Sequence, residues 1–198
     1  MTPQGDRTAP GIVCVVDDDG DLGAAVARLL ARQGYAATAF LDPERLLSSY
    51  AGAQPHCIVT DIMMGELDGF GFADRVRAID PTVAIVFMTA WPTTANAVDS
   101  VRRYGGLDYL EKPLDEARLL AAVAEGVAWS RRQRAIRART EVLSVRERQV
   151  FDLLVQGHSN KAVAAILCLS PKTIEYHRAA IAAKTGTSGL AQLIALSR

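Results

Sequence analysis

Long apolar runs are missing from this sequence of 198 residues, and none approaches the roughly 20 residues that a membrane-spanning helix needs. The first ten residues are polar and lack the apolar core of a secretory signal. With 49% hydrophobic and 22% charged residues, the composition also excludes collagen and low-complexity disorder. These absences predict a soluble globular protein of the cytoplasm with no membrane partner.

Cysteine is scarce, which excludes a disulfide scaffold. Cys14 and Cys57 lie inside apolar runs that are typical of strands, and Cys168 lies far from both. We interpret Cys14 and Cys57 as small buried hydrophobic residues, with a redox pair as the alternative.

The formal net charge is zero, but the charges are divided unevenly along the chain. Residues 1–126 hold 18 acidic and 10 basic residues, a net charge of −8. Residues 127–198 hold 4 acidic and 12 basic residues, a net charge of +8. This asymmetry predicts two domains with different partners, and the basic one suits a polyanion such as nucleic acid. The alternative is a basic face that only contacts solvent.

Apolar runs alternate with helical periodicity in the first part of the chain. The five apolar runs are residues 12–16, 35–40, 57–60, 83–88 and 107–110. Helical segments are predicted at 22–34, from 43, at 69–79, at 93–104 and from 114. Continuous apolarity indicates strands that are covered on both faces. The pattern therefore predicts an α/β fold with a doubly wound, five-stranded parallel sheet.

Polar residues follow the strands at the edge where such folds bind ligands. Asp17 and Asp18 follow the first strand, Asp61 the third, Thr89 the fourth and Lys112 the fifth. Clustered carboxylates repel one another and need a cation, and hard oxygen ligands suit Mg²⁺. Asp61 could act as a nucleophile that becomes an acyl phosphate, with its charge balanced by the metal and Lys112. Each residue alone could instead be a capping or turn residue.

The C-terminal part predicts only helices. Ser144 and Glu147 have the spacing of a capping box, and the helix that follows ends at Gly157. A second helix covers 160–167, a third opens at Ser170 with proline at its first position, and a fourth covers 190–196. Short helices joined by a tight turn, with a basic helix after them, indicate a helix-turn-helix arrangement.

Four segments of the first domain resemble the CheY-like receiver of response regulators: VVDDD (15–19), TDIMMGELDG (60–69), MTA (88–90) and DYLEKP (108–113). The resemblance implies that Asp61 accepts the phosphoryl group and that Lys112 pairs with it. It also implies that the peptide bond between Lys112 and Pro113 is cis. It implies Thr89 and Tyr109 as switch residues. The implied Mg²⁺ ligands are Asp18, Asp61 and the backbone carbonyl of Met63, with Asp17 acting through water. Two departures are Gly65, where the family usually has proline, and Gly106, where it commonly has alanine.

Residues 143–164 and 169–186 resemble the LuxR-type DNA-binding domain of the FixJ/NarL family, which carries four helices. The resemblance implies that the helix opened by Ser170 enters the major groove. The implied phosphate contacts are Lys161, Lys172, Thr173, His177 and Lys184. The residues implied to face base edges are Glu175, Tyr176, Arg178 and Ala179. His177 could instead cap or pack, and Glu175 could pair with a neighbouring arginine.

Together the two resemblances imply a receiver at 1–126, a helical linker at 127–142 and a DNA-binding domain at 143–198. We expect a two-component response regulator that a partner histidine kinase phosphorylates at Asp61, and that then dimerises, binds double-stranded DNA and controls transcription. We expect no enzyme activity beyond self-phosphorylation and dephosphorylation at Asp61. A constitutive DNA-binding factor whose receiver serves only for dimerisation is the alternative.

Two other classes fit the residues less well. A phosphatase that uses Asp61 as its nucleophile needs a general acid two residues later, where Met63 stands. A flavodoxin-like electron carrier needs a hydroxyl-rich phosphate loop, and Asp17, Asp18 and Asp19 would repel the phosphate.

Overall fold

The computed structural model describes residues 10–93 and 106–195. The chain forms two compact units, Met1–Arg131 and Arg132–Arg198, and the boundary falls within helix α5 (Glu116–Glu141). We describe each unit by itself.

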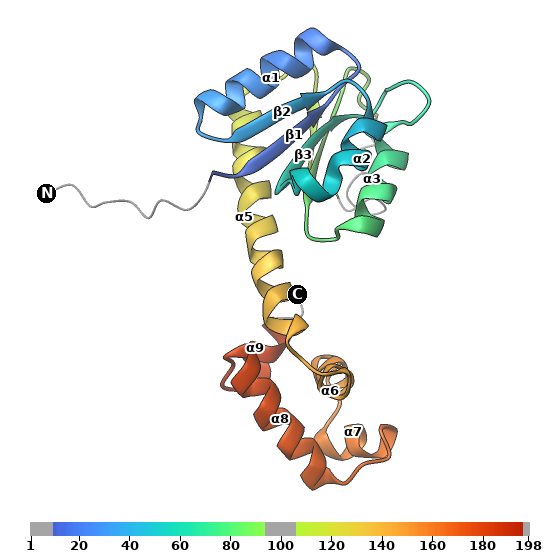
Figure 1. Ribbon diagram of the computed structural model, residues 1–198, viewed down its shortest axis with the longest axis vertical. Coiled ribbons are helices and arrows are strands. Elements are labelled where there is room, and N and C mark those ends of the chain that lie inside the picture. The colour runs from blue at the N-terminus through green and yellow to red at the C-terminus, as the bar shows by residue number, and fades with distance from the viewer. Residues whose placement is uncertain (1–9, 94–105, 196–198) are drawn as a thin grey trace, which may run out of the picture. The chain divides into compact units, whose positions relative to one another are not determined.

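Unit 1 is built on five parallel strands in the order β2-β1-β3-β4-β5 (Figure 1). The strands are β1 (Ile12–Val16), β2 (Ala36–Phe40), β3 (Cys57–Asp61), β4 (Ala84–Thr89) and β5 (Asp108–Glu111). Every residue of β3 and β4 is buried, as the continuous apolar runs predict. The parallel α/β fold expected from the sequence is confirmed.

Helices cover both faces of this sheet. They are α1 (Gly20–Arg32), α2 (Pro43–Ala53), α3 (Gly69–Ile79) and the first part of α5. Figure 1 shows α1 and α5 on one side of the sheet and α2 and α3 on the other, which agrees with the two separate apolar cores. The helix expected at 93–104 lies outside the described residues except for Thr93.

Side-chain caps set where the helices begin. Asp19 accepts hydrogen bonds from the backbone N–H groups of Asp21 and Leu22, so α1 begins at Gly20 rather than at Leu22 as expected. Asp42 and Asp68 cap α2 and α3 in the same way. Aspartate side chains therefore cap the N-termini of α1, α2 and α3.

The two buried cysteines belong to different layers. Cys14 packs in the core beside α2 and α3, whereas Cys57 packs in the core beside α1 and α5. Both thiols are free, and burial raises the pKa of each to about 12. They are small buried hydrophobic residues, and the redox pair considered as an alternative is not present.

Unit 2 packs helices around one apolar core that includes Val150, Leu154, Ile174 and Ile181. Its helices after α5 are α6 (Val145–Val155), α7 (Asn160–Ile166), α8 (Pro171–Thr185) and α9 (Leu190–Ala195). This helical domain agrees with the expected four-helix arrangement. Among the described residues of both units, no helix is long and apolar enough to cross a membrane.

The capping box expected in unit 2 is present. Ser144 Oγ accepts from the N–H of Glu147, and the Glu147 carboxylate accepts from the N–H of Ser144. Gly186 adopts a left-handed backbone with φ of 68° where α8 ends, a conformation that glycine tolerates without cost.

Candidate metal centre and nucleic-acid interface

Three acidic side chains gather where strands β1 and β3 end. Asp17 directly follows β1, and Asp61 is the last residue of β3, which pairs with β1. Both residues are buried, whereas Asp18 is exposed. One carboxylate oxygen from each of Asp17, Asp18 and Asp61 lies within 4.8 Å of the others. The structure thus brings together the three carboxylates that the sequence analysis singled out.

Lys112 supplies the positive charge for this cluster. Its Nζ donates to Asp17 Oδ2 at 2.8 Å and to Asp61 Oδ2 at 2.5 Å. Burial alone lowers the pKa of Lys112, but its hydrogen bonds to the two carboxylates and their charges outweigh burial, so the pKa is raised. Burial, together with the charge of Asp61, raises the pKa of Asp17 against the opposing effects of Lys112 and the Asp19 backbone N–H. The ammonium therefore stays protonated between two carboxylates.

The donor set fits a hard divalent cation. Mg²⁺ is bound in proteins by one or two carboxylates together with water and phosphate oxygens. The cluster offers two buried carboxylates and an exposed one that leaves a side open to water. The N–H of Met63 donates to Asp61 Oδ1 at 3.0 Å, so the Met63 backbone runs directly beside the carboxylate. Hard oxygen donors of this kind match the expected magnesium site.

Gly69 fixes the loop that follows Asp61, a role that sequence reasoning missed. Its N–H donates to the carbonyl of Ile62 at 2.9 Å. A Cβ at position 69 would lie 2.2 Å from the Asp61 backbone oxygen and 2.9 Å from Ile62 Cα. Only glycine permits so close an approach of the first turn of α3 to the end of β3. The Asp-Gly pair at 68–69 was the available signal, since Asp68 caps the helix that Gly69 begins.

Two further predicted residues lie beside the strand ends. Thr89 ends β4 and is fully buried, and its Oγ1 accepts from the N–H of Trp91 at 3.2 Å. Its carbonyl accepts from the N–H of Lys112 at 2.7 Å, which ties the ends of β4 and β5 together. The hydroxyl of Tyr109 is buried and has no hydrogen-bond partner among the described residues.

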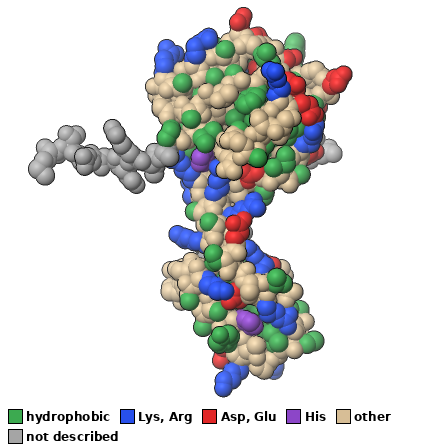
Figure 2. Space-filling model, viewed as in Figure 1, with side chains coloured by type: hydrophobic (Ala, Val, Ile, Leu, Met, Phe, Trp, Pro, Cys, Tyr) green, Lys and Arg blue, Asp and Glu red, His purple; other side chains and the backbone are tan. Residues whose placement is uncertain are grey.

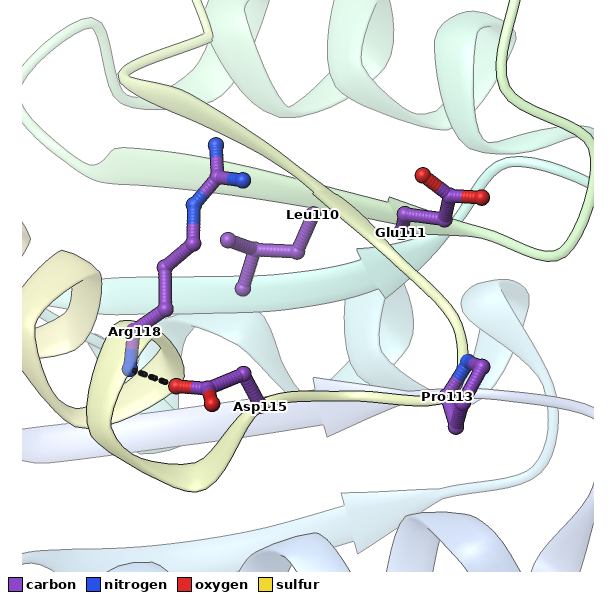
Figure 3. A pocket seen from close by; sticks show the side chains of 5 residues that line it. All are labelled: Leu110, Glu111, Pro113, Asp115 and Arg118. Atoms are coloured by element: carbon purple, nitrogen blue, oxygen red, sulfur yellow. Dashed lines mark hydrogen bonds between the residues drawn. The ribbon is translucent and has the colours of Figure 1, made fainter.

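The end of β5 and the residues after it line a separate pocket. The Lys112–Pro113 peptide bond is cis, as the resemblance implies. Pro113 lines a pocket of about 230 Å³ together with Leu110, Glu111, Asp115 and Arg118 (Figure 3). The N–H of Arg118 donates to Asp115 Oδ1 at 2.8 Å, which caps the start of α5. A larger cavity, of about 590 Å³, is lined by Asp18, Leu41, Met64 and Glu66 among others.

Helix α8 carries most of the residues predicted to touch DNA. Its exposed residues include Lys172, Glu175, Tyr176 and Ala179, and Tyr176 is 74% exposed. Thr173, His177 and Arg178 are half-buried, and Lys161 is exposed on α7.

On the visible face of unit 1, Asp and Glu side chains gather along one side (Figure 2).

Two of the predicted DNA-contacting side chains, Arg178 and Lys184, bind residues on other helices of unit 2. Arg178 Nη1 donates to Asn160 Oδ1 at 2.8 Å, which links α8 to the start of α7. Lys184 Nζ donates to Glu147 Oε2 at 2.7 Å, which links the last turn of α8 to the first turn of α6. These links join residues 18 and 37 positions apart, so no local sequence pattern could have revealed them.

Comparisons with known proteins agree with this geometry. Residues 13–124 match the response regulator receiver domain, and residues 141–197 match the bacterial regulatory proteins of the luxR family. The chain is 34% identical over 197 residues to the transcriptional regulatory protein FixJ of Bradyrhizobium diazoefficiens, covering 96% of both chains. It is 31% identical to the tetrathionate response regulatory protein TtrR of Salmonella typhimurium, covering 91% of this chain and 88% of that one.

Solved structures give the same result. Full-length FixJ from B. japonicum matches 96% of this chain and 97% of its own, with 32% identity and a TM-score of 0.55. The response regulator StyR matches 96% of this chain and 98% of its own, with 28% identity and a TM-score of 0.55. The chain therefore belongs to the FixJ-like response regulators of two-component systems, in which a receiver domain and a LuxR-type helix-turn-helix domain together control transcription.

Proposed function

We propose that Asp61 accepts a phosphoryl group from a partner histidine kinase, and that this modification promotes dimerisation and controls DNA binding. The observation that carries the proposal is the position of Lys112, whose ammonium contacts Asp61 and Asp17 at once. A carboxylate paired with a half-buried cation is prepared to receive an anionic group that it would otherwise repel.

The residues proposed to hold Mg²⁺ are Asp18, Asp61 and the backbone carbonyl of Met63, with Asp17 acting through water. Three carboxylate oxygens within 4.8 Å of one another support this set. When bound, the cation would neutralise the charge of the incoming phosphoryl group.

In the proposed transfer, a carboxylate oxygen of Asp61 forms a bond to phosphorus while the bond from phosphorus to the histidine nitrogen of the kinase breaks. That nitrogen keeps the electron pair. The Lys112 ammonium remains protonated and pairs with the added negative charge. The hydroxyl of Thr89, whose oxygen accepts from the N–H of Trp91, donates its own proton to a phosphoryl oxygen.

The proposed switch passes from Thr89 to Tyr109. Movement of Thr89 toward the phosphoryl group changes the space beside Tyr109, which lies on the adjacent strand in register with Phe87. The Tyr109 hydroxyl has no hydrogen-bond partner among the described residues, so moving it breaks no such bond. Its ring packs against the core beside α2 and α3, and a change there alters the surface that pairs two receivers.

The DNA-binding half of the proposal uses the exposed side of α8. We propose that Lys161, Lys172, Thr173 and His177 contact phosphates, and that Glu175, Tyr176, Arg178 and Ala179 face base edges. The exposure of Lys172, Glu175, Tyr176 and Ala179 supports this assignment. A dimer would bring two such helices to half-sites about one helical turn apart.

We propose that the receiver ends near residue 126, that 127–142 is a linker and that the DNA-binding domain begins near 143. The change in net charge from −8 to +8 supports this division. The receiver match ends at residue 124, and the luxR-family match begins at residue 141. In this proposal the protein is a regulator in the cytoplasm rather than an enzyme with its own substrate.

Phosphorylation of the full chain by acetyl phosphate and Mg²⁺ tests the proposal, with intact mass as the readout. We expect wild type to gain one phosphoryl group and Asp61→Asn to gain none. Asp74→Asn serves as a matched control, because Asp74 is exposed on α3 and is not one of the clustered carboxylates. A gain that persists in Asp61→Asn would refute the acceptor. No gain in wild type, together with unchanged DNA binding, would favour the constitutive alternative.

A further inference from the structure

Lys184 sits at an intermediate position around helix α8. Each residue turns an α-helix by about 100°, so Lys184 lies about 60° around the axis from buried Ile181. Lys172 lies about 40° from the exposed Tyr176, on the side opposite to the core. The two lysines of α8 therefore occupy different environments, although the sequence suggests phosphate contacts for both.

The partner of Lys184 is a carboxylate that the fold has largely removed from water. The side chain of Glu147 is 9% exposed, and its Oε2 accepts from the N–H of Ser144 and from Lys184 Nζ, both at 2.7 Å. The first turn of α6 thus holds a negative charge that the last turn of α8 neutralises. A buried carboxylate that loses its cation is strongly destabilising.

We propose that Lys184 is a positioning residue, which fixes helix α8 against helix α6 through Glu147 and does not contact a DNA phosphate. The inference rests on the DNA binding proposed above and assigns roles within that interface. Hydrogen bonds to Lys184 and to Ser144 hold the pKa of Glu147 at about 2, so the pair stays charged at neutral pH. Lys172 is exposed in the first turn of α8 and has no ion pair among the described residues, so it remains available for a phosphate.

The salt dependence of DNA binding separates the two roles. Each phosphate contact contributes about 0.9 to the slope of log affinity against log salt concentration. We would measure the full chain with a fluorescein-labelled duplex of mixed sequence by anisotropy, at salt concentrations from about 50 to 200 mM. Lys172→Gln should lower the slope by about 0.9. Lys184→Gln should weaken binding and leave the slope unchanged.

Hydrogen exchange of the amides in α6 and α8 tests the pair without DNA. Lys184→Gln should raise exchange by about tenfold, because it leaves the buried Glu147 carboxylate without its cation. The effect is not larger because the ammonium of Lys184 is itself partly exposed to water. Glu147→Gln should have a smaller effect, because water can solvate the freed lysine. The double variant Glu147→Gln with Lys184→Gln should exchange more slowly than Lys184→Gln alone, and Lys184→Arg should restore near wild-type exchange.

Three results would overturn the inference. One is a slope reduced by about 0.9 in Lys184→Gln with unchanged exchange, which is the behaviour of a phosphate contact. Another is a double variant that exchanges at least as fast as Lys184→Gln. The third is no change of exchange in Lys184→Gln. Failure of the proposed DNA binding would appear separately, as salt-independent or undetectable binding by both wild type and Lys172→Gln.

Discussion

The glycine that begins helix α3 provides a quantitative test of how Asp61 is positioned. In Gly69→Ala, the new Cβ would lie 2.2 Å from the Asp61 backbone oxygen and 2.9 Å from Ile62 Cα. An ordinary contact begins at 3.4 Å, so the first turn of α3 and the end of β3 must separate by about 1.2 Å. The clashing atoms belong to the backbone, so no side-chain rotation can relieve them.

We expect two measurable effects of Gly69→Ala. Forcing an extra methyl group into a closely packed site costs about 1–3 kcal/mol of unfolding free energy. Displacing a reacting group by about 1 Å lowers the rate about 100-fold, and the displaced residue here is Asp61 itself. The rate of mass gain from acetyl phosphate and Mg²⁺ reports the second effect, and urea unfolding of the full chain reports the first.

Two nearby glycines make the test specific. Gly65 is in the same loop and has nothing within 4 Å of an added Cβ, so Gly65→Ala should change the rate by no more than about twofold. A Cβ at position 71 would contact only the ends of the Leu67 and Asp68 side chains, at 3.1 and 3.2 Å. The phosphorylation rate of Gly71→Ala should therefore lie between the rates of Gly65→Ala and Gly69→Ala. Equal phosphorylation rates in all three variants would refute the reasoning, even if Gly69→Ala were less stable.

Three further predictions follow from buried charges and close packing. Lys112→Met should slow phosphorylation of Asp61 by about 100-fold or more in the mass assay, because it removes the ammonium that pairs with the new charge, and an unchanged rate would contradict this role. The pKa of Glu147 is lowered from 4.5 to about 2, so its charge stabilises unit 2 above about pH 4.5, and this stabilisation is lost as pH falls toward 2. In Glu147→Gln, the stability of unit 2, measured by hydrogen exchange, should therefore change less across that pH range than it does in wild type. Gly126→Ala places a Cβ 2.9 Å from Cys57 Sγ, so it should cost about 1–3 kcal/mol in urea unfolding, and adding Cys57→Ala should recover part of that loss.

Much of unit 1 could be predicted because its signals are local. The run from Ile12 to Val16 is apolar without interruption, and a strand buried on both faces needs such a run. Polar residues directly after the strands indicated the ligand-binding edge, and the structure brings Asp17, Asp61 and Lys112 within hydrogen-bonding distance there. The roles of these groups came from the resemblance to receivers, since chemistry alone left capping open for each residue.

Long-range contacts could not be predicted in the same way. The approach of Gly69 to the Asp61 carbonyl depends on how α3 docks, and glycine at that position is also compatible with an ordinary turn. Lys184 resembles any basic residue on a DNA-binding helix until the fold places it beside Glu147. The side chain that Lys184 contacts lies 37 residues away, on a helix whose orientation no periodicity specifies.

The register of the sheet, more than its loops, sets the geometry around Asp61. Lys112 reaches carboxylates that precede it by 95 and 51 residues, and it can do so because Asp61 pairs with Met88 while Thr89 pairs with Glu111. A shift of one residue in either pairing would turn the reacting side chains to the opposite face of the sheet. Loops that join the strands are under no such constraint where they point into solvent. Gly65, at the position where the resemblance to receivers leads us to expect proline, is one such case, since nothing lies within 4 Å of an added Cβ there.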